Sequence, residues 1–258
     1  MVWLTRIEQK ESFTHWENFP FSIPVLRATE VIELNAQVTI FVGENGSGKS
    51  TLMEAIALGC RLPALGGEDP QRDRTLEAVR PLAQAYRFGW RRRTRRGFFL
   101  RAEDFFNFVK RTNEKHAELA EYAERYKDEY FAGPAMRGQL RAHEERYEQD
   151  LDAHSHGETF LKIFQTRFVP DGLYLLDEPE AALSPQRQLA FLALLKDMTA
   201  QGAQFIIATH SPIIMAFPEA CLLSFDEEKL TPVDYEDLEH VRLLRHFLQD
   251  PQAYLRRL

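Results

Sequence analysis

Residues 43–51 read GENGSGKST and match the pattern G-x-x-x-x-G-K-[ST] at every position. A short apolar run at 38–42, VTIFV, precedes the pattern, and a run of helix-forming residues at 52–58, LMEAIAL, follows it. Between a strand and a helix, such a glycine-rich loop wraps backbone N–H groups around phosphate oxygens. The flanking residues therefore favour a phosphate-binding loop in an α/β fold over a glycine-rich turn with a chance lysine.

The residues of this loop have separate expected roles. Lys49 is expected to reach the β- and γ-phosphates of a nucleotide, and the Ser50 hydroxyl is expected to complete the shell of a magnesium ion. The N-terminus of the following helix adds a dipole that favours an anion. The predicted ATP ligands in this segment are Gly43, Glu44, Asn45, Gly46, Ser47, Gly48, Lys49, Ser50 and Thr51.

A second motif, LYLLDEPEAALS at 173–184, ends an apolar run with the adjacent carboxylates of Asp177 and Glu178. The run predicts a buried parallel strand, and its C-terminal end lies where ligands bind in α/β sheets. Asp177 can hold Mg²⁺ together with Ser50, while Glu178 can orient or deprotonate an attacking water. The alternative is an acidic turn after a core strand, and the phosphate loop makes it the weaker interpretation.

Two further segments carry polar groups that could face a phosphate. The apolar run at 205–208 is followed by Thr209 and His210, whose imidazole could hydrogen-bond the γ-phosphate one strand beyond the carboxylates. The segment 155–158, SHGE, places the Ser155 hydroxyl, Gly157 and free N–H groups at the start of a predicted helix. For this segment an anion site and a plain helix cap are equally supported.

The order of the predicted elements defines the fold class. From residue 157 onward helices and strands alternate, which predicts a mostly parallel sheet with right-handed crossovers. The first forty residues alternate around 2–7 and 29–34 and are expected to be an N-terminal β-region that forms the edge of a sheet leading into the phosphate loop. A length of 258 residues fits one ATPase domain over 1–258 with a helical insert at about 104–154.

The insert is predicted from a shift to charged, helix-forming residues between Val109 and Asp152, with Gly133-Pro134 dividing it into two helices. Apolar and aromatic side chains recur at helical spacing in the first helix. These residues are Leu119, Tyr122, Tyr126 and Tyr130. A packing stripe explains them without a ligand and is preferred to a stacking platform for bases.

Composition limits the cellular context and the partners. No run of 18 apolar residues and no secretory signal pattern is visible, so we expect a cytoplasmic protein without membrane insertion. Cys60 and Cys221 stand in apolar surroundings and are expected to be buried free thiols rather than a disulfide. The net charge of −7 gives no general attraction to nucleic acid or anionic lipid, so such contacts need a local patch.

One local patch is the run Arg91-Arg92-Arg93 with Arg95-Arg96, bracketed by Trp90 and Phe98. Phosphate contacts with nearby aromatic side chains are typical of nucleic-acid sites. A solvated loop, or a contact with the acidic side chains of the insert, is nevertheless preferred because the chain as a whole is acidic.

Taken together, the four motifs GENGSGKST, SHGE, LYLLDEP and ATHS resemble, in order and spacing, the ATP-binding cassette (ABC) ATPase superfamily. The resemblance covers nearly the whole chain and is nearest to small stand-alone bacterial ATPases related to the overcoming-lysogenization-defect and RecF-like group. It implies a phosphate-loop NTPase of ABC type that binds MgATP and closes as a head-to-tail homodimer around two nucleotides. Within it, Glu178 would be the general base, and Ser155 and Gly157 would touch the γ-phosphate of the partner chain's ATP.

Three departures from the superfamily pattern shape the expected role. SHGE lacks the first leucine and second glycine of LSGGQ and ends in Glu, as in chromosome-maintenance proteins. DEPEAALSP replaces the DEPTSALD of transporter subunits. No glutamine follows the strand GFFLRA, where Glu103 or Asn107 could substitute as the magnesium-loop residue.

These features favour an ATPase coupled to DNA maintenance or defence, with a DNA or protein partner. A nucleotide-binding subunit of a membrane ABC transporter and an ATP-gated regulatory switch remain the alternatives.

Overall fold

The computed structural model describes residues 1–10, 17–65, 73–127, 129, 132–147 and 156–256. The strands are β1 (Leu4–Gln9), β2 (Val31–Glu33), β3 (Val38–Val42), β4 (Tyr86–Trp90), β5 (Gly97–Arg101), β6 (Leu173–Asp177), β7 (Gln204–Ala208), β8 (Cys221–Ser224) and β9 (Thr231–Pro232). The helices are α1 (Pro24–Ala28), α2 (Lys49–Cys60), α3 (Arg80–Ala85), α4 (Ala102–Arg125), α5 (Ala132–Tyr147), α6 (His156–Arg167), α7 (Pro185–Ala200), α8 (Pro212–Met215), α9 (Glu239–Gln249) and α10 (Pro251–Leu255). Short 3₁₀ turns lie at Arg74–Val79, Pro179–Ala182 and Tyr235–Asp237.

The central sheet has the strand order β5-β6-β7-β3-β8-β9 and is parallel except for β9. All residues of β3, β6 and β7 are buried, as expected for parallel strands covered on both faces. The predicted fold class, an α/β phosphate-loop fold with a mostly parallel sheet, is confirmed.

Side chains from the two faces of the sheet enter two separate apolar clusters. Phe41 of β3 points into the cluster that contains α2, whereas Ile40 and Val42 point into the cluster that contains Phe164 of α6 and Phe191 of α7. This alternation follows from the two-residue period of a strand. The sheet is therefore a middle layer between α2 on one side and α6 and α7 on the other.

The register aligns the C-terminal ends of the strands that carry the predicted site. Asp177 of β6 stands opposite Ala208 of β7, and Ala208 stands opposite Phe41 of β3. The loops that follow these strands consequently meet at one edge of the sheet, where ligands bind in open α/β folds.

The first forty residues contain the expected β-structure, and β1 and β2 belong to a sheet separate from the central one. β1 pairs antiparallel with β2 and β4 in a separate three-stranded sheet of order β2-β1-β4. The buried side chain of Gln204 connects the two sheets. Its Oε1 accepts hydrogen bonds from the N–H groups of Trp3 (2.8 Å) and Leu4 (2.9 Å), and its Nε2 donates to the Leu4 carbonyl (2.8 Å). A side chain thus takes the hydrogen bonds that a neighbouring strand would otherwise provide.

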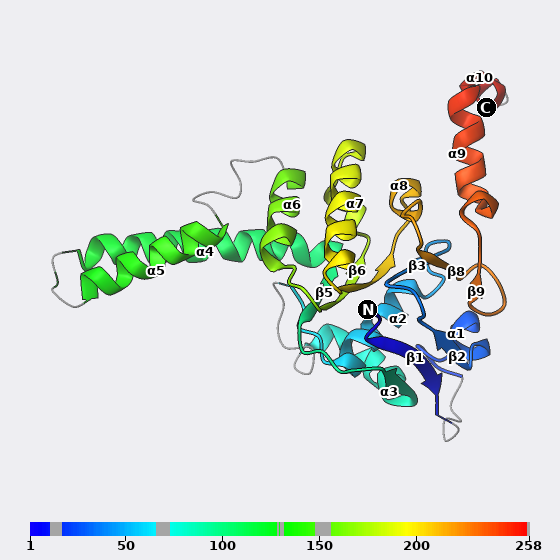
Figure 1. Ribbon diagram of the computed structural model, residues 1–258, viewed down its shortest axis with the longest axis horizontal. Helices are drawn as coiled ribbons and strands as arrows, with labels where there is room; N and C mark the ends of the chain where they lie inside the picture. Colours follow the sequence, from blue (N-terminus) through cyan, green and yellow to red (C-terminus); the bar gives the residue numbers. More distant parts are fainter. Residues whose placement is uncertain (11–16, 66–72, 128, 130–131, 148–155, 257–258) are drawn as a thin grey trace.

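Helices α4 and α5 lie antiparallel and project from the body as a long hairpin (Figure 1). The His116 Nε2 of α4 lies 3.3 Å from the Glu144 Oε1 of α5. On the predicted stripe Leu119 is buried, and the half-buried rings of Tyr122 and Tyr126 lie 6.3 Å apart. The arrangement agrees with a packing role for the stripe, of which Tyr130 lies outside the described residues.

Both cysteines are free thiols that are partly buried, and burial raises the pKa of each thiol. The predicted absence of a disulfide between them is confirmed. Among the helices of the described ranges, none combines the length and the apolar character needed to cross a bilayer.

Candidate nucleotide-binding site

The loop between β3 and α2 has the backbone that its glycines predict. Gly43, Gly46 and Gly48 have φ angles of 146°, 80° and 106°, a region that disfavours other residues. A Cβ on Gly48 would also lie 2.7 Å from Cγ2 of Ile23. The segment before α1 therefore packs directly against the phosphate loop, and glycine at position 48 is required for both reasons.

Lys49 begins α2 and is buried inside the loop. Its Nζ donates hydrogen bonds to the carbonyls of Gly43 (2.8 Å) and Glu44 (2.7 Å). Burial lowers the pKa of Lys49, while the carboxylates of Asp226 and Asp177 oppose that shift. The ammonium group is held at the centre of the loop, where phosphate oxygens would replace the loop carbonyls as its partners.

Asp177 and Ser50 face each other across the edge of the sheet. The Ser50 hydroxyl hydrogen-bonds the Asp177 side chain, and burial raises the pKa of Asp177 to about 6 despite that bond. The buried Oδ1 of Asp177 has no hydrogen-bond partner among the described residues. The Ser50 hydroxyl and the unpartnered Oδ1 of Asp177 are oxygen ligands of the kind that Mg²⁺ prefers. These two residues therefore fit the implied ion.

Glu178 and His210 come together as predicted from two neighbouring strands. Their Oε1 and Nε2 atoms are 4.0 Å apart, and the Glu178 side chain is 46% exposed. Glu178 has a left-handed backbone (φ 50°, ψ 52°), which for a non-glycine residue is strained and turns its side chain out of the strand direction. Its N–H is fixed by the Ala208 carbonyl at 2.8 Å.

Two carboxylates that sequence reasoning missed hold the loops of the site. Oδ1 of Asp226, which follows β8, accepts a hydrogen bond from the Glu44 N–H at 2.7 Å. Oε1 of Glu180 accepts one from the His210 N–H at 2.6 Å. Asp226 is an acidic residue just after β8, which pairs with β3. The sequence alone does not reveal that these two strands are neighbours, so the position of Asp226 becomes informative only once the strand order is known.

A pocket of about 310 Å³ joins the phosphate loop to the acidic strand end. It is lined by Asn45, Gly46, Gly48, Lys49, Ser50, Thr51, Glu178, Ile23 and Phe19. Phe19 is 58% exposed, an unusual position for a phenylalanine, and it was not singled out from the sequence.

The remaining predicted residues lie elsewhere or cannot be placed. Gly157 stands in the first turn of α6 and is not among the described residues that line the pocket of its own chain. Ser155 lies outside the described residues. For the magnesium loop, Asn107 is exposed on α4, whereas the side chain of Glu103 is outside the described part.

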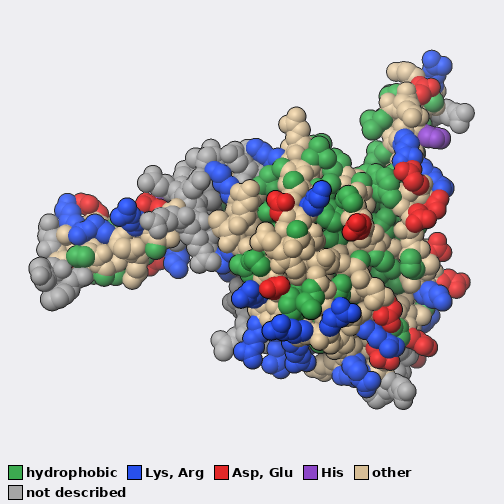
Figure 2. All heavy atoms as spheres, viewed as in Figure 1, with side chains coloured by type: hydrophobic (Ala, Val, Ile, Leu, Met, Phe, Trp, Pro, Cys, Tyr) green, Lys and Arg blue, Asp and Glu red, His purple; other side chains and the backbone are tan. Residues whose placement is uncertain are grey.

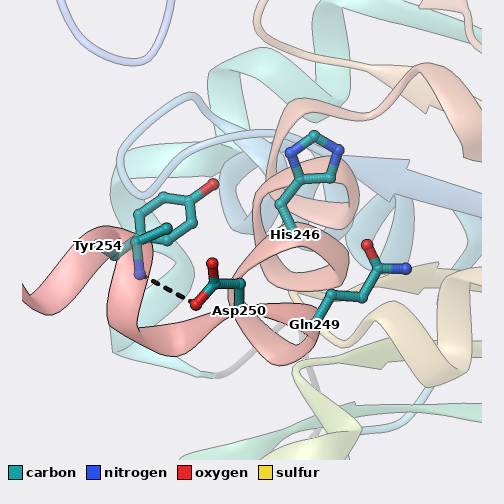
Figure 3. Close-up of a pocket in the computed structure, with 5 residues that line it drawn as sticks. His246, Gln249, Asp250 and Tyr254 are labelled. Carbon is teal, nitrogen blue, oxygen red and sulfur yellow. Dashed lines mark hydrogen bonds between the residues drawn. The ribbon is translucent and has the colours of Figure 1, made fainter.

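A larger hollow of about 600 Å³ lies at the corner between α9 and α10, away from the phosphate loop. His246, Gln249, Asp250, Ala253 and Tyr254 line it (Figure 3). Asp250 there caps α10, because its Oδ1 accepts a hydrogen bond from the Ala253 N–H at 3.2 Å (Figure 3). Helix capping accounts for the Asp250 carboxylate in this hollow.

Several solved structures are similar to this chain. The structure of cbiO1 from Clostridium perfringens, part of the ABC transporter complex cbiONQ, has 17% identity and a TM-score of 0.48, covering 100% of both chains. The SMC head domain from Thermotoga maritima has 17% identity and a TM-score of 0.44, covering 90% of this chain and 99% of that chain. No curated protein matches the sequence.

Two family models match the sequence over overlapping segments. A model described as "AAA domain" matches residues 17–78, which contain the phosphate loop. A model described as "AAA domain, putative AbiEii toxin, Type IV TA system" matches residues 68–216, more than half of the chain, including Asp177, Glu178 and His210. The chain therefore belongs to this AAA-domain family.

Proposed function

We propose that this chain hydrolyses ATP, with Mg²⁺, in a homodimer that encloses two nucleotides. The observation that carries the proposal is the convergence of Lys49, Asp177 and Glu178 on one edge of the sheet. Lys49 and Glu178 line one pocket there, together with other residues of the phosphate loop, Ile23 and Phe19.

Each residue has a role that its position supports. Loop N–H groups and the Lys49 ammonium would bind the β- and γ-phosphates. Ser50 and Asp177 would hold Mg²⁺, which when bound neutralises charge on the phosphate oxygens. Glu178 would take a proton from the water that attacks the γ-phosphorus while the bond to the β-phosphate oxygen breaks, releasing ADP and phosphate. His210, 4.0 Å from Glu178, would hydrogen-bond the γ-phosphate and keep the base oriented.

Dimerisation is supported by what the pocket of one chain lacks. Of the described residues, none from α6 lines the pocket. A second chain could supply Ser155 and Gly157 to close the open side over the γ-phosphate. Coupling to DNA maintenance or defence is part of the proposal, and the toxin–antitoxin term in the family description supports the defence role.

Hydrolysis is tested by phosphate release from purified protein. We expect Lys49→Ala to lower the rate at least about 100-fold, and Glu178→Gln to lower it by about 10²–10⁴-fold while ATP binding survives. Glu227→Gln, which removes an exposed carboxylate from the surface, serves as the control and should leave the rate unchanged. Wild-type protein without ATPase activity would refute the proposal.

The shared site is tested by mixing two inactive variants. Gly157→Asp damages the segment supplied in trans, and Lys49→Ala damages the loop used in cis. An equimolar mixture forms mixed dimers in which one site has an intact loop and an intact partner segment, so activity should return in the mixture only. Size-exclusion chromatography of Glu178→Gln with ATP should show a dimer, and failure of both results would exclude the enclosed dimer.

A further inference from the structure

The loop from Arg91 to Arg96 joins β4 to β5 and concentrates five arginines in six residues, all of them exposed. The loop is held in place by hydrogen bonds. Thr94 Oγ1 donates to the Asp171 carbonyl at 2.9 Å and accepts from the Arg96 N–H at 3.1 Å. A guanidinium nitrogen of Arg96 donates to the Pro170 carbonyl at 3.1 Å. The arginines are therefore presented from an anchored loop.

None of the five guanidinium groups forms an ion pair with a carboxylate anywhere in the described ranges. The chain has 39 acidic and 32 basic residues. Carboxylates are therefore in excess overall, and yet this run of arginines has no carboxylate partner among the described residues. By contrast, Arg242 and Arg245 near the C-terminus are paired with Asp237 and Glu236. The arginine loop is a local concentration of positive charge on an acidic protein.

The position of the loop separates it from the nucleotide site. At the start of β5, Gly97 stands opposite Leu173, and at its end Arg101 stands opposite Asp177. The loop thus lies at the N-terminal ends of the strands, whereas the phosphate-binding site lies at their C-terminal ends. The length of β5 separates the two by about 15 Å, at a rise of ~3.3 Å per residue. The helical hairpin leaves from the far end of β5 at Ala102. Among the described residues, no ion pair of the kind that the sequence had suggested joins an acidic side chain of the hairpin to the arginine loop. Figure 2 shows a dense group of Lys and Arg side chains on the body below the hairpin.

The aromatic residues beside the loop argue against base recognition. Phe98 is buried, and its ring stacks on those of Phe164 (6.4 Å) and Phe168 (5.6 Å). Trp90 is half-buried and packs on the apolar core. Binders of single strands stack bases on exposed aromatic rings, which this loop does not offer. Recognition of double-stranded RNA uses contacts to 2′-hydroxyls, whereas the loop's hydroxyl, that of Thr94, is already engaged on both sides.

We propose that the loop 91–96 docks on the phosphate backbone of duplex DNA, without sequence preference and independently of the ATP site. Arginine guanidinium groups fit phosphate oxygens in bidentate geometry, and duplex DNA carries about one charge per 1.7 Å of its axis. A compact row of unpaired arginines matches that charge density. The surface needs neither bound nucleotide nor hydrolysis.

The test measures binding of the full chain to a duplex DNA of about 30 base pairs by fluorescence anisotropy, without nucleotide, over a salt series. Arg92→Ala/Arg95→Ala removes two arginines whose side chains make no hydrogen bond within the described structure. This variant should weaken binding about tenfold or more and reduce the slope of log K against log salt by about 2. Arg242→Ala/Arg245→Ala removes the same charge from ion-paired positions and should bind like wild type.

Three further measurements distinguish duplex DNA from other ligands and this surface from the nucleotide site. Lys49→Ala should bind DNA normally, which distinguishes this surface from the nucleotide site whether or not the chain hydrolyses ATP. Tighter binding of the matching RNA duplex, or of vesicles containing anionic phospholipid, would overturn the assignment to DNA. Equal weakening by both double-arginine variants, or no DNA binding by wild type, would also overturn it.

Discussion

At the residue scale, Asp177 carries a buried carboxylate whose negative charge is only partly stabilised by neighbouring groups in the nucleotide-free protein. Burial raises its pKa from 3.8 to about 6. Between about pH 4 and pH 6 the folded carboxyl keeps a proton that the unfolded chain has released, so the free energy of unfolding falls as pH rises through this window and stays lower above it.

Asp177→Asn should therefore stabilise the nucleotide-free protein. A shift of this size corresponds to about 3 kcal/mol in the free energy of unfolding at pH 7.5, and the gain should shrink towards pH 5. Urea denaturation in EDTA measures both values, and the exposed Asp197→Asn on α7 serves as the control. An unchanged or lower stability of Asp177→Asn at pH 7.5 would contradict this account.

Phe19 is the second residue whose position calls for a role. Its exposed ring lines the pocket next to the phosphate loop, where the adenine of a bound nucleotide could stack on it. Phe19→Ala should raise the Kd for ATP about fivefold with little change in kcat, since a stacked aromatic pair contributes about 1 kcal/mol.

Inorganic triphosphate distinguishes stacking from damage to the loop, because it has no base. Its affinity should be the same for Phe19→Ala and wild type, and Phe19→Tyr should retain ATP binding. Loss of triphosphate affinity in Phe19→Ala would show instead that the ring supports the phosphate loop.

At the scale of elements, Arg101 connects four parts of the chain at the end of β5. Its buried guanidinium lies 3.7 Å from Glu54 on α2, 3.3 Å from Asp73 before the 3₁₀ turn and 3.5 Å from Asp104 on α4. Three carboxylates around one cation make the cation essential, because its removal leaves partly buried charges that repel one another.

Arg101→Met should lower the free energy of unfolding by about 3–5 kcal/mol. Arg125→Met on α4 is the matched control, since Arg125 forms an exposed pair with Glu121 that contributes only about 0.5 kcal/mol. Urea unfolding of both variants gives the comparison. Similar small losses in the two variants would mean that the buried cluster is not coupled.

At the scale of the whole molecule, the described residues at the base of α4 join the helical hairpin to the apolar core. Phe105, Phe108 and Val109 of α4 belong to the same buried cluster as Phe160 and Phe164 of α6. Beyond them, His116 and Glu144 connect the two helices to each other.

Replacing residues 118–142 with a short glycine linker should leave ATP binding unchanged and shift Tm by no more than about 3 °C. A longer deletion that also removes Phe105, Phe108 and Val109 should lower Tm by more than about 10 °C, because it opens the core. Differential scanning calorimetry with and without ATP measures both effects. Loss of the fold in the shorter variant would show that the distal hairpin is part of the core.

Residues close together in the chain carried most of what could be predicted about this protein. The phosphate loop, the acidic strand end and the strand before His210 are local patterns whose glycines, carboxylates and apolar runs act within a few residues. They were enough to predict the α/β fold and the side chains that converge at one sheet edge, because parallel strands bring their C-terminal ends together.

Only the tertiary structure decided which distant segments meet. Gln204 binds β1 from about 200 positions away, Asp226 fixes Glu44 from 182 positions away, and Phe19 comes to rest over the loop. Such contacts leave no periodic or local mark, since a single polar or aromatic residue has the same neighbours in the chain whichever partner it finds. The sequence by itself determined which reactive side chains the site contains. The packing of the three-stranded sheet and of the loops determined how those side chains are positioned.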